Sequence, residues 1–382
     1  MNIVFLDCTQ NLGYNFSAGN SKVEMLAKGL KAQGNSIHVI NGLVGYSMIN
    51  KTERLETNTI DTIITYPRRR FSKILSFLNL SNIRTDLKNL YNLKEKNILI
   101  IEQQYIHIYN LYIHLAHSLG YRVVVISQEW LPTIKRKLWI QNLTSSLYAK
   151  TFGKHVDAIL PISEFIINKI KHFNKPYLKV PILADYPDET PEEDKINTFL
   201  YCVYANYFRV ISFIIDSFSL YYNTVDNPYS LTLILTGSPI QIERVKKYID
   251  EKRLTDAIII KTKLPYPNLI KAFKSARALL IPLNPDFEQD KARFSQKIAE
   301  YLSSATPIIS NNVGEIEYYF TNNKNIILSD YSIGGFANTF KWVQDNPDIA
   351  SQIGLEGFNL GKQEFNCIKF GEKLDNFLNT IF

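Results

Sequence analysis

The chain has 382 residues, 46% of them hydrophobic and 13% aromatic, which suits two domains of about 180 residues each better than one core. No apolar run approaches the roughly 18 residues of a membrane span, and the amino terminus enters a strand without a basic leader, so we expect a cytosolic protein. Cys8, Cys202 and Cys367 are widely spaced and fit no metal pattern, so neither a disulfide nor a zinc site is expected.

Charge is divided unevenly along the chain, whose overall net charge is +7. Residues 1–180 hold 23 Lys and Arg against 11 Asp and Glu, whereas residues 181–382 hold 20 against 25. The first half is therefore basic and the second mildly acidic. This asymmetry indicates an anionic partner for the first half: a nucleic acid, a phosphorylated substrate or an anionic membrane.

The first half begins with a pattern typical of a βαβ unit. A strand over residues 3–7 is followed by a polar loop over 8–20, a helix over 21–33 and a strand over 36–40, with Gly34 at the expected helix C-cap. The loop has Gly13 and Gly19 but no G-x-G-x-x-G sequence, so it matches a dinucleotide-binding motif only weakly. It is either a ligand-binding loop or a plain connection.

Further strands are predicted over residues 97–102, 122–127 and 158–162, and Ser163 is expected to cap the helix after the last of them. Their alternation with helices predicts a doubly wound parallel sheet, which binds ligands at the carboxyl ends of its strands. Gln128 and Glu129 follow one of these strands directly. Glu129 either acts chemically, by stabilising a positive charge or accepting a proton, or forms a structural salt bridge.

Two basic clusters with aromatic and aliphatic neighbours, residues 66–78 and 135–139, have the composition of interfacial segments. At about 1 kcal/mol per Lys or Arg near an anionic leaflet, they would hold the protein reversibly on the inner membrane face. The alternative is that both clusters are solvated surface. No helix-turn-helix, RRM or zinc-finger pattern accompanies the charge, so no nucleic acid is expected.

Residues 183–197, rich in Pro and acidic side chains, predict a linker between an N-terminal domain (1–182) and a C-terminal domain (198–360). The alternation restarts after it, which predicts a second Rossmann-like domain. Its expected strands cover 198–204, 231–235, 257–260, 278–282 and 307–310, and its expected helices 211–222, 240–250, 267–275 and 296–304. Residues 361–382 predict a terminal helix, which either caps the second domain or crosses back to the first.

One isolated acid, Glu300, lies on the helix predicted over residues 296–304. Ser295 is expected to cap this helix, whose amino end would then be available to an anion. Gln296 and Glu300 share one helix face, and helical side chains lean toward the amino end. A phosphate at the cap and a sugar hydroxyl at Glu300 fit this arrangement; the alternative is an ordinary crossover with a solvated Glu300.

Residues 294–298 and 300–302, FSQKI and EYL, resemble the donor-binding motif of glycosyltransferase family 4 and related GT-B enzymes. Residues 26–39 likewise resemble the end of the first helix and the second strand of that family. The resemblance implies that Glu300 binds the nucleotide ribose. Ala292 stands where the family has a first Glu, so a carboxylate contact to the donor sugar would have to come from Glu288 or Asp290 in the loop.

The resemblance implies further site residues. Gln128 and Glu129 stand where the family often has a His-Asp type pair beside the transferred sugar, and the loop with Gly13, Gly19 and Asn20 would face the acceptor and the donor phosphates. The other donor-binding candidates are Arg209 as the phosphate ligand, Lys297 and Lys263 as its partners, and Gly237, Ser238, Leu264, Phe294, Ser295 and Gln296.

We therefore expect a GT-B α/β protein, with two Rossmann-like doubly wound parallel-sheet domains facing across a cleft. The implied activity is retaining transfer of a sugar from a nucleoside-diphosphate donor to a hydroxyl of a glycan or lipid-linked saccharide, in the synthesis of lipopolysaccharide or another cell-surface polysaccharide. No metal and no cofactor are implied, and the chain has no Asp-x-Asp. Two alternatives stay open: a degenerate, non-catalytic binding subunit and a nucleotide-sugar epimerase.

Overall fold

The computed structural model of the chain describes residues 1–9, 12, 18–42, 49, 51–67, 79–102, 106–133, 139–191 and 193–382. Gly13 and most of both basic clusters, residues 68–78 and 135–138, lie outside the described residues. Within them no helix is both long and apolar enough to cross a membrane.

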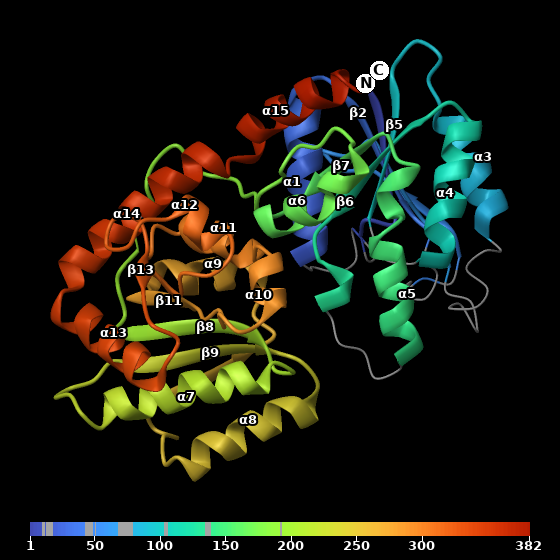
Figure 1. Ribbon diagram of the computed structural model, residues 1–382. Coiled ribbons are helices and arrows are strands. Elements are labelled where there is room, and N and C mark those ends of the chain that lie inside the picture. Colours follow the sequence, from blue (N-terminus) through green and yellow to red (C-terminus); the bar gives the residue numbers. More distant parts are fainter. Residues whose placement is uncertain are drawn as a thin grey trace. The chain divides into compact units, whose positions relative to one another are not determined.

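The chain divides into two compact units (Figure 1). Unit 1 comprises Met1–Asp185, Ala292–Gln296 and Phe365–Phe382, and unit 2 comprises Tyr186–Lys291 and Lys297–Glu364. The division after Asp185 falls inside the segment 183–197 that was expected to be a linker. Residues 292–296, expected in the second domain, group with unit 1.

Unit 1 contains a sheet with the strand order β3-β4-β2-β1-β5-β6-β7. Every neighbouring pair is parallel except β3 with β4. The central strands are buried and apolar, as expected for a sheet covered on both faces. The strands are β1 (Asn2–Leu6), β2 (Ser36–Asn41), β3 (Glu53–Leu55), β4 (Thr62–Thr65), β5 (Asn97–Glu102), β6 (Arg122–Ser127) and β7 (Ala158–Pro161).

The helices of unit 1 begin and end where local signals place them. The first, α1 (Ala18–Ala32), starts three residues before the predicted helix, and Gly34 follows it with a φ of +81°. Ser163 caps α6 by accepting a hydrogen bond from the Ile166 amide, as predicted. The other helices are α3 (Leu80–Leu90), α4 (Ile106–Ser118), α5 (Trp139–Ala149), α6 (Glu164–Ile170) and α15 (Cys367–Asn379).

The order of the strands reverses direction within this sheet. From β1 the chain moves outward through β2 to β4, and then returns to β5 on the other side of β1 and moves outward through β6 to β7. The connections after β1 and β5 therefore lead away from each other. Open α/β sheets bind ligands at such a reversal.

Unit 2 repeats this design with an all-parallel sheet in the order β10-β9-β8-β11-β12-β13, in which the reversal lies between β8 and β11. The strands are β8 (Thr198–Tyr204), β9 (Ser230–Thr236), β10 (Ile258–Thr262), β11 (Ala278–Ile281), β12 (Ile308–Ser310) and β13 (Ile327–Leu328). The predicted strands are found within three residues at each end, and β13 was not predicted. The predicted doubly wound parallel architecture is confirmed for both units.

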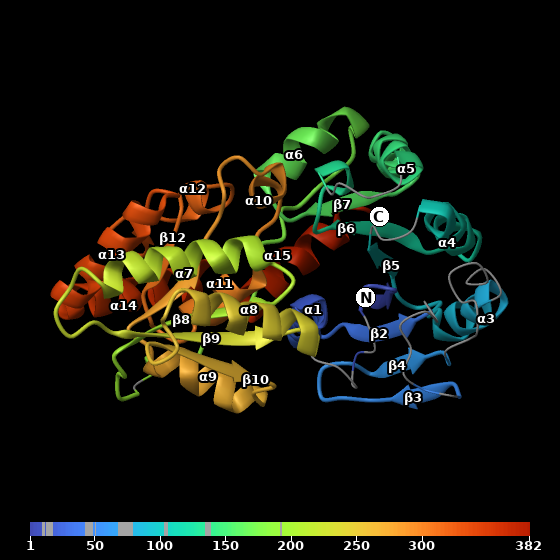
Figure 2. The ribbon, with the colours of Figure 1, turned by 90° about the horizontal axis from the view of Figure 1, so that it is seen from below.

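Helices cover both faces of this second sheet. Figures 1 and 2 show α7 (Phe208–Tyr222) and α8 (Pro239–Glu251) along the same face, where they share an apolar core with alternate residues of β8 and β9. The remaining helices are α9 (Tyr266–Ser275), α10 (Glu288–Ala292), α11 (Gln296–Leu302), α12 (Ile316–Tyr319), α13 (Ile333–Asp345) and α14 (Pro347–Glu364). The segment expected to be one terminal helix over 361–382 comprises the end of α14 and the separate α15.

The helix α15 packs on α1 within unit 1. Its apolar residues Phe370, Leu374 and Leu378 are part of the core of that unit. The two helices touch at Gly29 and Gly371, where a Cβ on Gly29 would lie 2.2 Å from the Cys367 carbonyl oxygen and one on Gly371 would lie 2.3 Å from the Gly29 backbone. The two backbones can approach this closely only because neither glycine has a side chain.

We predict that Gly29→Ala lowers the free energy of unfolding of the chain by about 1–3 kcal/mol, because the added methyl overlaps backbone atoms of α15 and forces the helices apart. Thermal unfolding followed by circular dichroism measures the effect. Gly334→Ala on α13 is the matched control, since a Cβ there meets no atom within 4 Å. Equal stability of Gly29→Ala and Gly334→Ala would contradict the close contact.

Candidate functional site

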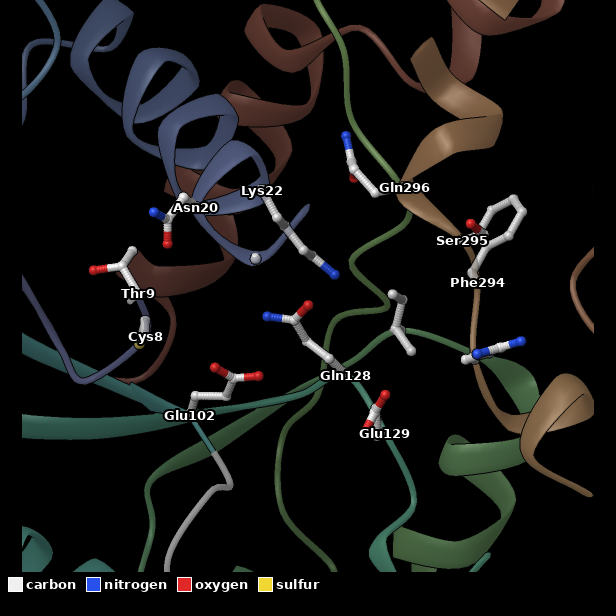
Figure 3. Close-up of a pocket in the computed structure, with 13 residues that line it drawn as sticks. Cys8, Thr9, Asn20, Lys22, Glu102, Gln128, Glu129, Phe294, Ser295 and Gln296 are labelled. Atoms are coloured by element: carbon white, nitrogen blue, oxygen red, sulfur yellow. The ribbon is translucent and has the colours of Figure 1, made fainter. Parts of the chain in front are cut away.

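A pocket of about 380 Å³ lies at the carboxyl edge of the unit 1 sheet (Figure 3). Its walls come from the residues after β1, β6 and β7, from the last residue of β5, from the first turns of α1 and from the segment 293–296, all of which belong to unit 1. The lining residues are Cys8, Thr9, Gly19, Asn20, Lys22, Glu102, Gln128, Glu129, Ile162, Arg293, Phe294, Ser295 and Gln296.

Lys22 is the most unusual of these residues. Its side chain is 2% exposed, and its ammonium nitrogen has no hydrogen-bond partner among the residues that the structure describes. Burial lowers the pKa of Lys22 to about 7, against a smaller opposing effect of Glu102. Figure 3 shows the ammonium group pointing into the pocket, in the space between Gln128 and Gln296. The pocket therefore presents a desolvated cationic group to whatever occupies it.

The predicted catalytic residues both line this pocket. The amide nitrogen of Gln128 is buried and has no hydrogen-bond partner in the described part of the chain, so it is a second donor available to a ligand. Glu129 is more exposed, and Figure 3 shows its carboxylate below the side-chain amide of Gln128. Gly19 and Asn20, expected in the loop, lie in the first turn of α1 and line the same pocket, so they meet the predicted pair in one site.

The segment 293–296 closes the pocket in a way that the sequence did not predict. Ser295 makes no hydrogen bond with another described residue, so the predicted N-cap bond is wrong. Ser295 lines the pocket instead. The side-chain amide of Gln296 is hydrogen-bonded to the backbone of Leu183. Its nitrogen donates to the Leu183 carbonyl, and its oxygen accepts from the Leu183 N–H at 3.4 Å. The ring of Phe294 packs edge-on against Phe365 at 5.7 Å. Gln296 and Phe294 thus support the wall of the pocket.

In unit 2, Glu300 is buried on α11, with 8% of its surface exposed. Burial raises the pKa of Glu300 to about 7, and nearby Lys297 opposes the shift. No described residue donates a hydrogen bond to its carboxylate. Lys297 instead donates to the carbonyl of Cys202 in β8 at 2.7 Å, so its ammonium group braces α11 against the sheet. Glu300 is therefore a buried acid whose hydrogen-bonding capacity is unused.

Arg209 lies at the start of α7, beside the reversal between β8 and β11. Its guanidinium group is exposed and stacks on the Phe287 ring at 4.5 Å, in the connection that follows β11. Cation–π stacking holds the guanidinium group in place, and its N–H groups make no hydrogen bond to another described residue, so they can bind an anion. This location fits the predicted role as a phosphate ligand.

The acids expected to replace the missing family Glu were predicted to lie in a loop, but the structure places both on the short helix α10. Asp290 is buried and accepts a hydrogen bond from the Asn284 amide at 2.9 Å, so it stabilises the preceding turn. Glu288 is exposed. Ala292 is buried, and its carbonyl accepts a hydrogen bond from Ser163 at 2.6 Å. Of the two acids, only Glu288 has a solvent-accessible carboxylate.

The remaining donor-binding candidates follow β9 and β10, on the same edge of the sheet as Arg209 but farther from the reversal. Gly237 has a φ of +145°, and Ser238 caps α8 in a capping box with Gln241. Lys263 is exposed in the left-handed region at a φ of +53°, and Leu264 is half-buried. The Ser238 hydroxyl is thus used by the fold, whereas the backbone at Gly237 and the Lys263 side chain face solvent.

Solved structures share this architecture over the whole chain. Sucrose-phosphate synthase from Thermosynechococcus elongatus matches with a TM-score of 0.76 at 13% identity, over 100% of this chain and 98% of that one. The Anabaena protein HepE, in complex with UDP and glucose, matches with a TM-score of 0.72 at 9% identity, over 99% of each chain. The chain has the GT-B fold.

A third GT-B structure, the lipopolysaccharide outer core galactosyltransferase WaaB without ligand, matches with a TM-score of 0.63 at 14% identity over 100% of both chains. The sequence matches no protein-family model and no curated protein. The resemblance to GT-B proteins noted in short motifs is therefore confirmed at the level of the fold.

Sequence reasoning missed six residues of the pocket: Cys8, Thr9, Lys22, Glu102, Ile162 and Arg293. Lys22 had a readable signal, because it precedes Leu26 by four residues and Leu30 by eight and so lies on the buried stripe of α1. Glu102 is the last residue of the apolar strand β5, and Gln128 and Glu129 directly follow β6 in a comparable position. Arg293 had no local signal.

The described residues contain no group of three or more His, Cys, Asp or Glu side chains able to hold a metal ion.

We predict that Lys22→Met raises the melting temperature of the ligand-free protein, because it replaces a buried, unpartnered ammonium group with an apolar side chain of similar length. Between about pH 7 and 10.5 the unfolded chain holds this proton and the folded chain does not, so wild-type stability increases with pH there. The advantage of the variant should be largest below pH 7 and shrink above it. A lower melting temperature for Lys22→Met than for the wild type would show that Lys22 stabilises the folded protein.

Proposed function

We propose that the protein is a glycosyltransferase that moves a sugar from a nucleoside-diphosphate donor to a hydroxyl of a glycan or lipid-linked saccharide. In this reaction the acceptor oxygen forms a bond to the anomeric carbon of the sugar. The bond between that carbon and the diphosphate oxygen breaks, and its electron pair stays on the diphosphate. The acceptor proton passes to the leaving diphosphate. The GT-B fold and its likeness to structures solved with UDP and glucose support this assignment.

The observation that favours it most is the buried carboxylate of Glu300. An acid buried to this extent, with no donor from a described residue, is costly to ionise unless a ligand supplies hydrogen bonds. The two adjacent hydroxyls of a ribose can donate one bond to each carboxylate oxygen. Glu300 also occupies the position of the ribose-binding acid in the family that the sequence resembles, so the motif and the physical requirement agree.

We further propose that the reaction is retaining and needs no metal. Without a metal ion, the charge of the departing diphosphate has to be balanced by protein groups. The Arg209 guanidinium group, fixed on Phe287 at the strand reversal, supplies one cation, and Lys263 supplies another on the same edge of the sheet. Catalysis would then rest on positioning and electrostatic stabilisation.

The loss of the first family acid keeps a second candidate function open. Ala292 is buried and Asp290 is occupied by a backbone amide, which is compatible with a degenerate GT-B subunit that binds nucleotide or glycan without catalysis. A nucleotide-sugar epimerase would convert the donor into an epimeric nucleotide sugar and release no free nucleotide, with or without an acceptor, whereas a transferase would release the nucleotide when the acceptor is present. Nucleotide release with and without an oligosaccharide acceptor separates these activities.

We predict that Glu300→Gln weakens the binding of UDP roughly tenfold or more, since hydrogen bonds to a charged group contribute about 1.5–3 kcal/mol. Ribose hydroxyls bind the ionised acid, so wild-type affinity should rise as pH increases toward about 7 and then level off. The variant should retain only the pH dependence of UDP itself. Isothermal titration across this range, with GDP and ADP in parallel, measures both effects.

Glu317→Gln, at an exposed acid of unit 2, is the matched control and should bind UDP as the wild type does. Unchanged affinity in Glu300→Gln would contradict the ribose site. Failure of all three nucleotides to bind the wild type would favour a degenerate binding subunit.

We also propose that the protein contacts anionic membranes reversibly through α5. Trp139, which is 74% exposed, Leu143 and Leu147 form an exposed apolar stripe on this helix at spacings of four residues. Lys150 follows the stripe, and the basic residues 135–137 precede it in the sequence. Exposed apolar side chains flanked by positive charge match the apolar boundary and negative headgroups of an anionic leaflet.

We predict that the double variant Trp139→Ser with Leu143→Ser loses most of the binding of the wild type to vesicles of phosphatidylglycerol and phosphatidylcholine. Co-sedimentation measures this, and high salt should weaken the wild type too, because part of the attraction is electrostatic. Leu93→Ser, at a leucine 92% exposed elsewhere in unit 1, is the control. Equal vesicle binding by the wild type, the double variant and Leu93→Ser would contradict a membrane contact through α5.

A further inference from the structure

The pocket of unit 1 has a cationic group that the proposed donor site does not use. Glu300 and Arg209, which the proposed donor site uses for the ribose and the phosphates, belong to unit 2, whereas Lys22 belongs to unit 1. Lysines with a buried ammonium group are rare, because desolvating a charge without a partner costs several kcal/mol. A ligand that brings a negative charge would remove this cost. Lys22 therefore needs an explanation of its own.

We propose that Lys22 is the centre of an anion-binding site in unit 1 that takes a phosphate or carboxylate group on the acceptor sugar. This inference rests on the proposed glycosyltransferase function. The Lys22 ammonium group and the buried Gln128 amide nitrogen are two unpartnered donors, within the described chain, that line one pocket. A tetrahedral or planar oxyanion can accept from both. Gly19 and Asn20, in the first turn of α1, line the same pocket, and the amino end of a helix favours an anion.

The other groups of the pocket define the rest of the acceptor. Glu102 from β5 and Glu129 from β6 are acids that suit sugar hydroxyls and would repel a second anion, while Arg293 adds a positive charge from the segment 293–296. Cys8, after β1, stays a neutral thiol because burial raises its pKa. A volume of about 380 Å³ is at the small end of ligand pockets, which span about 300–1,000 Å³. One charged monosaccharide unit is the ligand that fits this chemistry.

Binding of an anion should depend on pH in a defined direction. The anion binds the ammonium form, so affinity should fall as pH rises above about 7, where Lys22 loses its proton in the free protein. Sulfate and glucuronate are suitable probes because neither titrates in this range. Glucose, the neutral counterpart of glucuronate, should bind more weakly and without this pH dependence.

The test is isothermal titration of the whole protein with sulfate, glucuronate and glucose, for wild type, Lys22→Met and Lys28→Met. Lys28 lies on the same helix and pairs with Asp185, so its variant controls for loss of one positive charge. We expect Lys28→Met to bind both anions as the wild type does, and Lys22→Met to bind them at least about tenfold more weakly. Stronger binding of sulfate would identify a phosphorylated acceptor, and stronger binding of glucuronate an acidic sugar.

Three results would overturn the proposal. They are equal anion affinity in wild type and Lys22→Met, no anion binding by the wild type, and displacement of sulfate by saturating UDP, which would assign Lys22 to the donor diphosphate. Independent binding of UDP and sulfate supports an acceptor site. Failure of UDP to bind while Lys22-dependent sulfate binding persists would refute the proposed transferase function and leave the anion site standing.

Discussion

The constraint on which both halves of this protein depend is the parallel alignment of strands in a sheet covered on both faces. Parallel strands bring all their carboxyl ends to one edge, and a sheet buried on both sides leaves that edge as the natural place for polar side chains. In unit 1 the strand order reverses between β1 and β5, and the pocket lies at that edge. In unit 2 the reversal between β8 and β11 is where Arg209 stacks on Phe287.

Two buried ionisable groups of opposite sign give these edges their chemistry. Lys22 in unit 1 and Glu300 in unit 2 both have a pKa of about 7 because burial disfavours their charged forms. Neither has a hydrogen-bond partner for its charged group among the described residues. Each is therefore matched to a ligand of the complementary kind: an oxyanion for the ammonium group and a diol for the carboxylate. A sugar acceptor with an anionic group and a nucleotide with a ribose together meet both requirements.

The sequence predicts the architecture well, because strand and helix patterns are local: β8 is found at its predicted residues, and α6 is capped by Ser163 as expected. The site was predicted only in part. Gln128 and Glu129 follow a strand end and could be placed, but the assignment of 292–296 to unit 1 depends on contacts far apart in the chain. Ser295 was predicted as an N-cap from local propensity alone, which tertiary packing can override, and the residue lies in the pocket wall instead.

The most direct test of this account is a crystal structure of the protein grown with UDP. The account predicts that the ribose hydroxyls lie within hydrogen-bonding distance of the Glu300 carboxylate and that the diphosphate is bound by Arg209. The pocket around Lys22 should hold no part of the nucleotide. A uridine nucleotide bound in that pocket, with the Glu300 carboxylate unliganded, would contradict both the donor site and the anion site proposed for the acceptor.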